Sequence, residues 1–403
     1  MRTTLVHLQR SLHWPVLAPA GLLLACGLLV LAGLEIPVGG KWVAGWHLRQ
    51  LPVGRSAVAA WPLRRLTVLA VAVGPAAFAL LVPYKAIVDR AYLLYGANML
   101  LLVFALVASE ARNNTKRWIT VFGFDFQPSE LMKLTLVVTL ARFIRFRSSY
   151  KTFKGLGTPS PLTLMPTVLI PKQPDLSTGL LCIPILFTML FVAGARPRHL
   201  GTIALLGALA MYPVYEWGLK PYQKQRITGF LAQLPGFEGR VVEDAIVKEM
   251  LEKENYQLGK SKIAMGAGGW TGVGAGNGED QALYRVPERH NDFISPAVGP
   301  EGGPLGTVTV LGLLAWLLLA VLGVAGRQRD PAGRLICVGV AALFGFQAFV
   351  NLAMTIGLMP VTGMTLPFLS YGRSSIVVSV LAVALVCNVA ARPSYEFGRG
   401  DFD

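Results

Sequence analysis

The chain has 403 residues, of which 53% are hydrophobic and only 15% are charged, and its mean hydropathy is +0.53. Soluble domains carry about 25% charged residues, so this composition excludes an ordinary soluble protein and indicates a chain that lies mostly in lipid. The net charge of +15 does not indicate nucleic-acid binding, because the basic residues are scattered through short loops instead of forming one stripe.

Apolar runs near the ~20 residues that cross a ~30 Å hydrocarbon layer recur along the chain and predict transmembrane helices. The fourth and fifth runs are short or interrupted by charge. The ten predicted helices cover residues 15–37, 66–84, 92–109, 129–146, 161–171, 177–194, 199–218, 304–326, 335–359 and 374–392. We therefore expect an all-α polytopic membrane protein that forms a single membrane domain over residues 1–403.

The distribution of Lys and Arg predicts both termini in the cytoplasm, because the segments that would be inside hold more of them than the short outer loops do. The first outer loop is an exception, since it is basic. Its basic residues are Lys41, Arg49, Arg55, Arg64 and Arg65. With this orientation the one long polar segment, residues 219–303, lies on the outer side, where a polar head group could react.

Two patterns stand out within residues 219–303. Apolar residues at helical spacing over 242–252, set against acidic and basic ones, predict an amphipathic helix on the membrane surface or against the bundle. Residues 265–278 hold seven glycines and predict a loop. A phosphate-binding loop would need a Gly-Lys-Ser or Gly-Lys-Thr ending followed by a helix, and neither is present.

Ionisable groups at membrane depth are costly, so each is a candidate for function. The first group lies in Gln-Pro-Ser-Glu-Leu-Met-Lys, residues 127–133, where Pro128 suits the first position of a helix and Glu130 suits its N-terminal end. Glu130 and Lys133 are three residues apart and share one face. They are either a capped helix start with a lysine that reaches the interface, or an ion pair that positions a substrate phosphate or a catalytic carboxylate.

Two further polar groups would face outward. In the insert Lys-Gln-Pro-Asp-Leu, residues 172–176, Asp175 either caps a tight turn or serves a function. In Pro-Glu-Arg-His-Asn-Asp-Phe-Ile, residues 287–294, Arg289, His290 and Asp292 lie close together at the membrane edge. Such a group could tune a carboxylate toward proton abstraction, and the alternative is a solvated loop with a local ion pair.

Residues 359–375, between the last two predicted spans, contain two prolines and two glycines. They predict a re-entrant, non-helical loop, which must be buried in protein or line a wet cavity. Elsewhere, no Cys or His pair has the spacing of a zinc site, and no Ser, His and Asp order supports covalent acyl transfer. The four cysteines, which fall inside apolar runs, are read as small core hydrophobes; they are Cys26, Cys182, Cys337 and Cys387.

Five motifs, in this order, resemble those of the shape, elongation, division and sporulation (SEDS) proteins, a family that includes rod-shape and cell-division peptidoglycan glycosyltransferases. The resemblance spans about residues 90–392. The motifs are Gln-Pro-Ser-Glu-Leu-Met-Lys, Lys-Gln-Pro-Asp-Leu, Gly-Gly-Trp-Thr-Gly-Val-Gly, Pro-Glu-Arg-His-Asn-Asp-Phe and Pro-Val-Thr-Gly-Met-Thr-Leu-Pro-Phe-Leu-Ser-Tyr-Gly.

The resemblance implies ten helices, both termini in the cytoplasm, and polymerisation of lipid II into glycan strands at the outer face of the bacterial cytoplasmic membrane. It also implies a class B penicillin-binding protein as the transpeptidase partner. The essential aspartate of the family corresponds to Asp292 in His-Asn-Asp-Phe. Asp292 would take the proton from the acceptor hydroxyl as that oxygen attacks the donor's anomeric carbon and displaces a polyprenyl diphosphate with inversion.

The leaving diphosphate needs positive charge. The candidates for supplying this charge are Lys133, Arg289, Lys116 and Arg117, with or without a loosely held Mg²⁺ or Mn²⁺. No tightly bound cofactor is expected. The remaining candidates for binding or supporting the substrate are Glu130, Asp175, His290, Ser370 and Arg373.

Three departures from the family pattern indicate a divergent member. Arg373 and Ser177 each stand where the family has a glycine. The family's pair of glutamates stands here as Pro300 and Glu301, so that proline replaces the first glutamate. Arg373 would reshape the outer cavity or supply another phosphate contact. Pro-Glu-Arg-His resembles the elongation branch and Gly-Ala-Gly-Asn, residues 274–277, the division branch; elongation is favoured. The alternative functions are a flippase that moves lipid II without chemistry, and a scaffold that recruits the transpeptidase but no longer catalyses.

Overall fold

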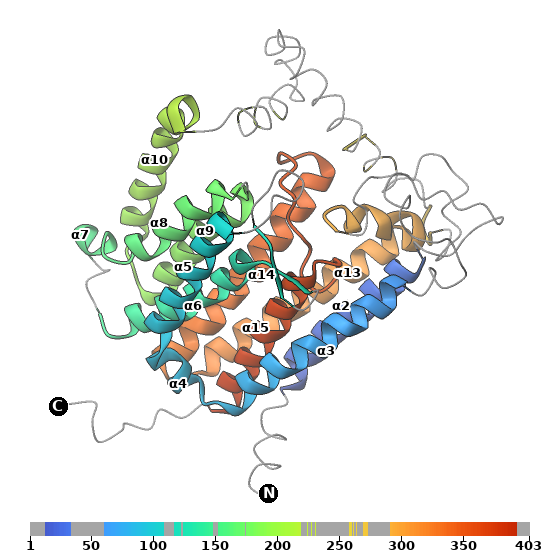
Figure 1. The fold of residues 1–403 in the computed structure, drawn as a ribbon, viewed down its shortest axis with the longest axis horizontal. Coiled ribbons are helices and arrows are strands. Elements are labelled where there is room, and N and C mark those ends of the chain that lie inside the picture. The colour runs from blue at the N-terminus through green and yellow to red at the C-terminus, as the bar shows by residue number, and fades with distance from the viewer. Residues whose placement is uncertain are drawn as a thin grey trace, which may run out of the picture.

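The computed structural model describes residues 13–33, 60–108, 117–121, 124–147, 152–173, 175–218, 269–272 and 291–392, together with a few single positions between 224 and 263. Figure 1 shows these parts as a bundle of helices packed side by side, with α10 extending away from it. The predicted amphipathic helix over 242–252 and most of the predicted loop over 265–278 lie outside the described residues. Positions 269–272 of that loop form a turn.

Each of the ten predicted apolar segments coincides with a helix of the structure. The helices are α2 (Trp14–Gly33), α3 (Ala60–Leu81), α4 (Tyr84–Asp89), α5 (Ala91–Ala108), α6 (Pro128–Arg145), α7 (Phe153–Leu156), α8 (Ser160–Leu169), the 3-10 helix η3 (Ile170–Lys172), α9 (Leu176–Ala193), α10 (Pro197–Pro213), the π-helix η4 (Val214–Gly218), α13 (Ile294–Arg327), α14 (Pro331–Ile356) and α15 (Arg373–Ala391). Five of them, α2, α9, α13, α14 and α15, are long and apolar enough to cross a membrane by length and composition. The predicted all-α class is therefore confirmed.

Local sequence signals set several of the helix ends. The Asp175 side chain accepts a hydrogen bond from Thr178 N at 3.3 Å at the start of α9, which ends at Gly194 in the left-handed region (φ 102°). Asp330 caps α14 in the same way, and Gly357 (φ 84°) ends it. These are the usual beginnings and ends of helices, because a short polar side chain satisfies the first free N–H groups and glycine adopts a positive φ without strain.

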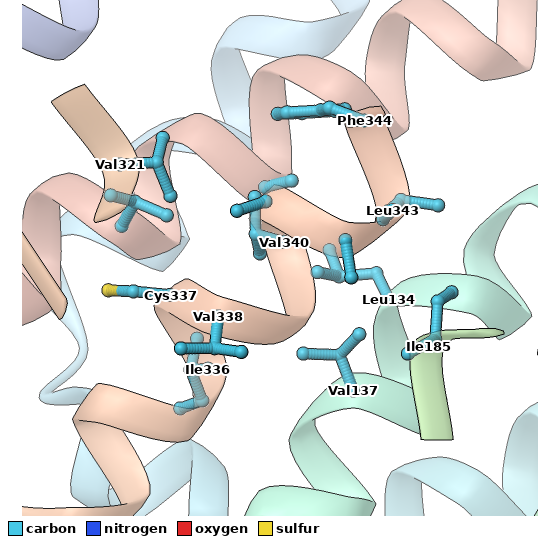
Figure 2. Packing of buried hydrophobic residues seen from close by; sticks show 14 of the residues in the cluster. Leu134, Val137, Ile185, Val321, Ile336, Cys337, Val338, Val340, Leu343 and Phe344 are labelled. Atoms are coloured by element: carbon cyan, nitrogen blue, oxygen red, sulfur yellow. The ribbon is translucent and has the colours of Figure 1, made fainter. Parts of the chain in front are cut away.

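Helices α14 and α15 are the most buried of the candidate spans, at 72% and 78%, and α14 packs against α6, α9 and α13. Figure 2 shows Val340, Leu343 and Phe344 of α14 beside Leu134 and Val137 of α6, Ile185 of α9 and Val321 of α13. At Gly339 a Cβ atom would lie 2.5 Å from Val137 Cγ1. Helices α14 and α6 therefore approach closely enough that only glycine fits, which fixes the polar residues of the two helices relative to each other.

The outer surfaces of the bundle are apolar. Large hydrophobic side chains such as Leu29, Phe78, Leu93 and Leu209 are exposed on α2, α3, α5 and α10, as expected for surfaces that face lipid chains. The four cysteines are free; Cys182, Cys337 and Cys387 are buried and Cys26 is partly buried. Their interpretation as core hydrophobes is confirmed.

Helix α13 begins earlier than expected. We predicted a span from residue 304, with the preceding residues in the outer loop, but the chain is helical from Ile294 and kinks at Gly303 (φ 61°, ψ −165°). Gly302, Gly303 and Pro304 interrupt the helical pattern in the sequence. The kink is fixed by tertiary contact, because a Cβ atom at Gly272 would lie 2.2 Å from Glu301 O, so the turn at 269–272 packs directly on the α13 backbone.

A short antiparallel hairpin precedes α6 and was not predicted. Strands β1 (Ile119–Val121) and β2 (Phe124–Phe126) pair with Thr120 opposite Asp125. Strands of three residues are too short to show a period of two in the sequence.

Candidate functional site

The chain between α14 and α15, residues 357–372, forms the re-entrant loop that the sequence predicts. It is non-helical, with no regular secondary structure at 360–366 and a turn at 367–369. Its side chains Met364, Leu366, Phe368 and Leu369 are buried. The prediction of non-helical backbone buried within the protein is therefore confirmed.

Side chains from other helices bind the carbonyl groups of this loop. Because buried carbonyl groups without partners are costly, such bonds allow irregular backbone at this depth. The bonds run from Ser177 Oγ to Thr362 O at 2.7 Å, from Asn351 Nδ2 to Met364 O at 2.5 Å, from Gln347 Nε2 to Thr365 O at 2.9 Å, and from Arg65 Nη1 to Leu369 O at 2.8 Å.

Arg65 was expected in the basic first outer loop, and the structure corrects this. Its side chain lies in α3, is fully buried, and also donates to Phe368 O. Phe368 has a positive φ of 63°. A Cβ atom at Gly27 of α2 would lie 2.6 Å from the guanidinium nitrogens, so the arginine fits only because that residue is glycine. No local signal distinguishes Arg65 from its basic neighbours, since its partners lie some three hundred residues away.

Glu130 and Lys133 form a buried ion pair near the start of α6. Lys133 Nζ lies 2.9 Å from both carboxylate oxygens of Glu130 and 3.3 Å from Gln347 Oε1. Only 8% of Glu130 and 2% of Lys133 is exposed. The predicted ion pair is therefore present, and Lys133 is buried instead of reaching outward; a role of the pair in positioning a substrate phosphate or a catalytic carboxylate stays a prediction. Through Gln347 the pair contacts the re-entrant loop.

Asp175 joins the first turns of α6 and α9. Besides capping α9, its Oδ2 atom accepts hydrogen bonds from Gln127 Nε2 at 2.8 Å and from Ser129 Oγ at 3.2 Å. Asp175 is 5% exposed. The capping interpretation is confirmed, and a substrate-binding role for Asp175 stays a prediction.

Asp292 lies directly before α13 and faces the re-entrant loop. A Cβ atom at Gly363 would lie 3.3 Å from Asp292 Oδ2, and Gly363 has a positive φ of 74°. The Asp292 main-chain carbonyl accepts a hydrogen bond from Asn351 Nδ2 at 2.8 Å. Because Asn351 and Gln347 are four residues apart on α14, they share one face of that helix. The Asp292 segment and the Glu130–Lys133 pair are thus tied to the same face and the same loop.

Arg373 pairs with Asp125 of the hairpin, with Nη1 3.3 Å from Oδ2. Thr120 Oγ1 donates to the other oxygen of that carboxylate at 2.8 Å, and Ser374 Oγ donates to Asp125 O at 3.2 Å. The arginine that replaces the family's glycine therefore fastens the hairpin to the start of α15. A phosphate contact by Arg373 stays a prediction.

The remaining candidates are placed as follows. Ser370 Oγ accepts from Leu366 N at 2.7 Å and stabilises the turn of the re-entrant loop. The Arg117 guanidinium lies 5.9 Å from the centre of the Trp118 ring. Lys116, Arg289 and His290 lie outside the described residues. Within the described ranges, no group of three or more His, Cys, Asp or Glu side chains could hold a metal ion.

The sequence site omitted Asn351, Gln347 and Arg65, which bind the loop and the Asp292 segment. Asn351 and Gln347 are uncharged amides in an apolar helix, and Arg65 is a basic residue at the edge of one. Buried Asn and Gln at membrane depth are themselves costly without partners, and this is the signal that could have identified Gln347 and Asn351.

Comparison with known proteins gives consistent matches. The family described as "Cell cycle protein" (FtsW, RodA, SpoVE) matches residues 52–395. The probable peptidoglycan glycosyltransferase FtsW of Geobacter sulfurreducens is 34% identical over 297 residues, which cover 73% of this chain and 75% of that protein. The protein of the same name from Nitrosomonas europaea is 32% identical over 327 residues, 79% of each chain.

Two solved structures share the fold. One chain of a peptidoglycan synthase complex, described as coordinating polymerization and crosslinking, has a TM-score of 0.75 and 27% sequence identity. The rod shape determining protein RodA of Thermus thermophilus has a TM-score of 0.64 and 25% identity. Each match covers 95% of this chain and 98% of the other chain.

Proposed function

Because the chain belongs to the SEDS family of cell cycle proteins, we propose that it is a multi-pass membrane glycosyltransferase that polymerises peptidoglycan from lipid II. The observation that carries this proposal is the placement of Asp292. Its carboxylate faces the re-entrant loop at Gly363, and the same loop is bound by Gln347, the partner of the buried Lys133. A carboxylate and a buried cation are thus grouped around one fixed segment.

In the proposed reaction, Asp292 acts as the general base. The acceptor sugar hydroxyl forms a bond to the anomeric carbon of the donor, the bond from that carbon to the diphosphate oxygen breaks, and the hydroxyl proton passes to Asp292. Attack opposite the leaving group inverts the anomeric centre. Donors from three helices, α3, α9 and α14, brace the re-entrant loop, which holds the base in place during the reaction.

The diphosphate that leaves carries negative charge and needs positive charge near it. We propose that Lys133 and Arg117 contribute, together with Lys116 and Arg289. Lys133 is held by Glu130 with its third hydrogen bond directed to Gln347 and thus toward the loop. A loosely held Mg²⁺ or Mn²⁺ would neutralise the diphosphate further, and the diphosphate itself would supply most of its ligands.

The proposed location is the bacterial cytoplasmic membrane, with the site at the outer face and both termini in the cytoplasm. The first residue before α2, His13, lies beside Cys387 near the end of α15, which supports the two ends of the chain on one side. The proposed partner is a class B penicillin-binding protein, in line with the synthase complex that shares this fold. We favour a role in elongation, on the Pro-Glu-Arg-His motif; the relatives include FtsW proteins and a RodA structure.

The test is a polymerisation assay with purified protein in lipid vesicles, labelled lipid II, and the transpeptidase partner present or absent. Wild-type protein should make long glycan strands, and Asp292→Ala and Asp292→Asn should make none while they still bind lipid II. Strands from the Asp292 variants would refute the proposed base. No strands from wild type, despite normal folding and lipid II binding, would favour the flippase or the scaffold.

A further inference from the structure

Asn351 is a fully buried amide that lies between three segments of the chain. Asn351 lies on α14. Its Nδ2 atom donates to the carbonyl of Asp292, just before α13, at 2.8 Å and to the carbonyl of Met364, in the re-entrant loop, at 2.5 Å. Its Oδ1 atom accepts from Ser295 Oγ in α13 at 3.1 Å. None of the side chain is exposed, so the three bonds use its polar groups without water.

The chemistry of the partners fixes the orientation of this amide. Asp292 O and Met364 O are carbonyl oxygens and can only accept, so the NH₂ group must face them. The Oδ1 atom then faces the Ser295 hydroxyl, which donates. A side chain with two donors on one atom and an acceptor on the other is required here, and at this length only asparagine provides it.

The same nitrogen holds both the Asp292 backbone and the loop segment that the Asp292 carboxylate faces. Met364 directly follows Gly363, whose missing Cβ would lie 3.3 Å from Asp292 Oδ2. Loss of the amide would therefore free the main chain of Asp292 and the loop segment that its carboxylate faces, while the α14 backbone, which is packed against α6, stays in place.

We propose that Asn351 is a positioning residue for the transfer reaction, which sets the place and direction of the Asp292 carboxylate without touching the substrate. The inference rests on the proposed role of Asp292 as base. A displacement of about 1 Å at a reacting group costs on the order of 100-fold in rate, so the amide should affect the turnover rate far more than substrate binding.

The first experiment compares Asn351→Ala with Thr139→Val as a control. Thr139 is also fully buried, and its hydroxyl donates to Thr135 O within α6, so the control removes a buried hydrogen-bonding group away from the re-entrant loop. In the lipid II assay we expect kcat to fall roughly 10- to 100-fold in Asn351→Ala, with KM for lipid II changed by less than about twofold. Thr139→Val should keep kcat within about threefold. Both are assayed well below their unfolding temperatures, measured in the same detergent.

The second variant, Asn351→Asp, keeps the shape of the side chain and guards against a folding defect in Asn351→Ala. Its carboxylate would face two carbonyl oxygens and donate to neither. When protonated it regains one donor. The ratio of its kcat to that of wild type should therefore rise as the pH is lowered, whereas a residue with a merely structural role would give a constant ratio.

The proposal is overturned if kcat of Asn351→Ala falls no further than that of Thr139→Val, or if KM rises in step with the loss of kcat. A constant Asn351→Asp ratio across pH would also overturn it. These results are distinct from failure of the proposed function: activity in Asp292→Ala would refute the base, whereas an inactive Asp292→Ala beside a fully active Asn351→Ala refutes the positioning role alone.

Discussion

The buried Glu130–Lys133 pair allows a quantitative test of its energetic role. In Lys133→Met the carboxylate of Glu130 would lose its cationic partner in a site that is only 8% exposed. Breaking a buried pair by removing one partner costs about 3–5 kcal/mol, because the remaining charge is left uncompensated. We expect this loss in the free energy of unfolding of Lys133→Met, and a similar loss in Glu130→Gln.

The double variant Glu130→Gln/Lys133→Met removes both charges and should be more stable than the sum of the single losses predicts. The difference, a coupling energy of about 2 kcal/mol or more, measures the pair itself. The control is Thr139→Val in the same helix, which involves no charge. It loses a buried hydroxyl that donates to Thr135 O at 2.7 Å, and its free energy of unfolding should fall by about 1 kcal/mol.

The assay is reversible unfolding of the purified protein in mixed micelles with increasing SDS, followed by tryptophan fluorescence and by circular dichroism. Glycan synthesis is measured in parallel, and should be lost in the single variants and not restored in the double variant. The reasoning would be refuted if each single variant lost less than the Thr139→Val control, or if the single losses simply added in the double variant.

Two further variants test the geometry around this site, and a third tests the other end of α14. Gly363→Ala should lower kcat about tenfold or more at unchanged lipid II affinity in the vesicle assay. The backbone φ of 74° is strained for alanine, and the added Cβ would lie 3.3 Å from Asp292 Oδ2. Full activity would show that the carboxylate turns away. Asp125→Asn, which breaks a partly exposed salt bridge to Arg373, should change the free energy of unfolding by less than about 1 kcal/mol but speed hydrogen exchange in the hairpin, and unchanged exchange would contradict the fastening role. Tyr84→Phe loses the hydrogen bond to the α14 cap, 2.9 Å long, and should cost about 1 kcal/mol. Burial and the neighbouring Asp330 carboxylate raise the pKa of Tyr84 above its ordinary 10.0. Wild type should therefore lose stability as the pH rises above 10, and the pH dependence of Tyr84→Phe should be flatter. Parallel pH profiles of the two proteins would contradict this role of Tyr84.

Local patterns in the sequence determined much of the fold. The apolar runs located the helices, since any segment that crosses lipid must satisfy its backbone internally and present apolar side chains. The spacing of Glu130 and Lys133 placed both on one face of a helix, and the prolines and glycines of residues 359–375 excluded a helix there. Each of these signals depends on residues a few positions apart, which is why it could be predicted from the sequence.

The tertiary structure alone decided which residues complete the site. Asn351 meets Asp292 across 59 positions of the chain and Arg65 meets Phe368 across 303, and the kink of α13 at Gly303 depends on contact between Gly272 and the α13 backbone. Their surrounding sequences carry no periodic signal, because their partners are set by the packing of helices far apart in the chain. Buried carbonyl groups need donors wherever the folded chain brings them, and the helices that supply those donors are chosen only when the bundle closes.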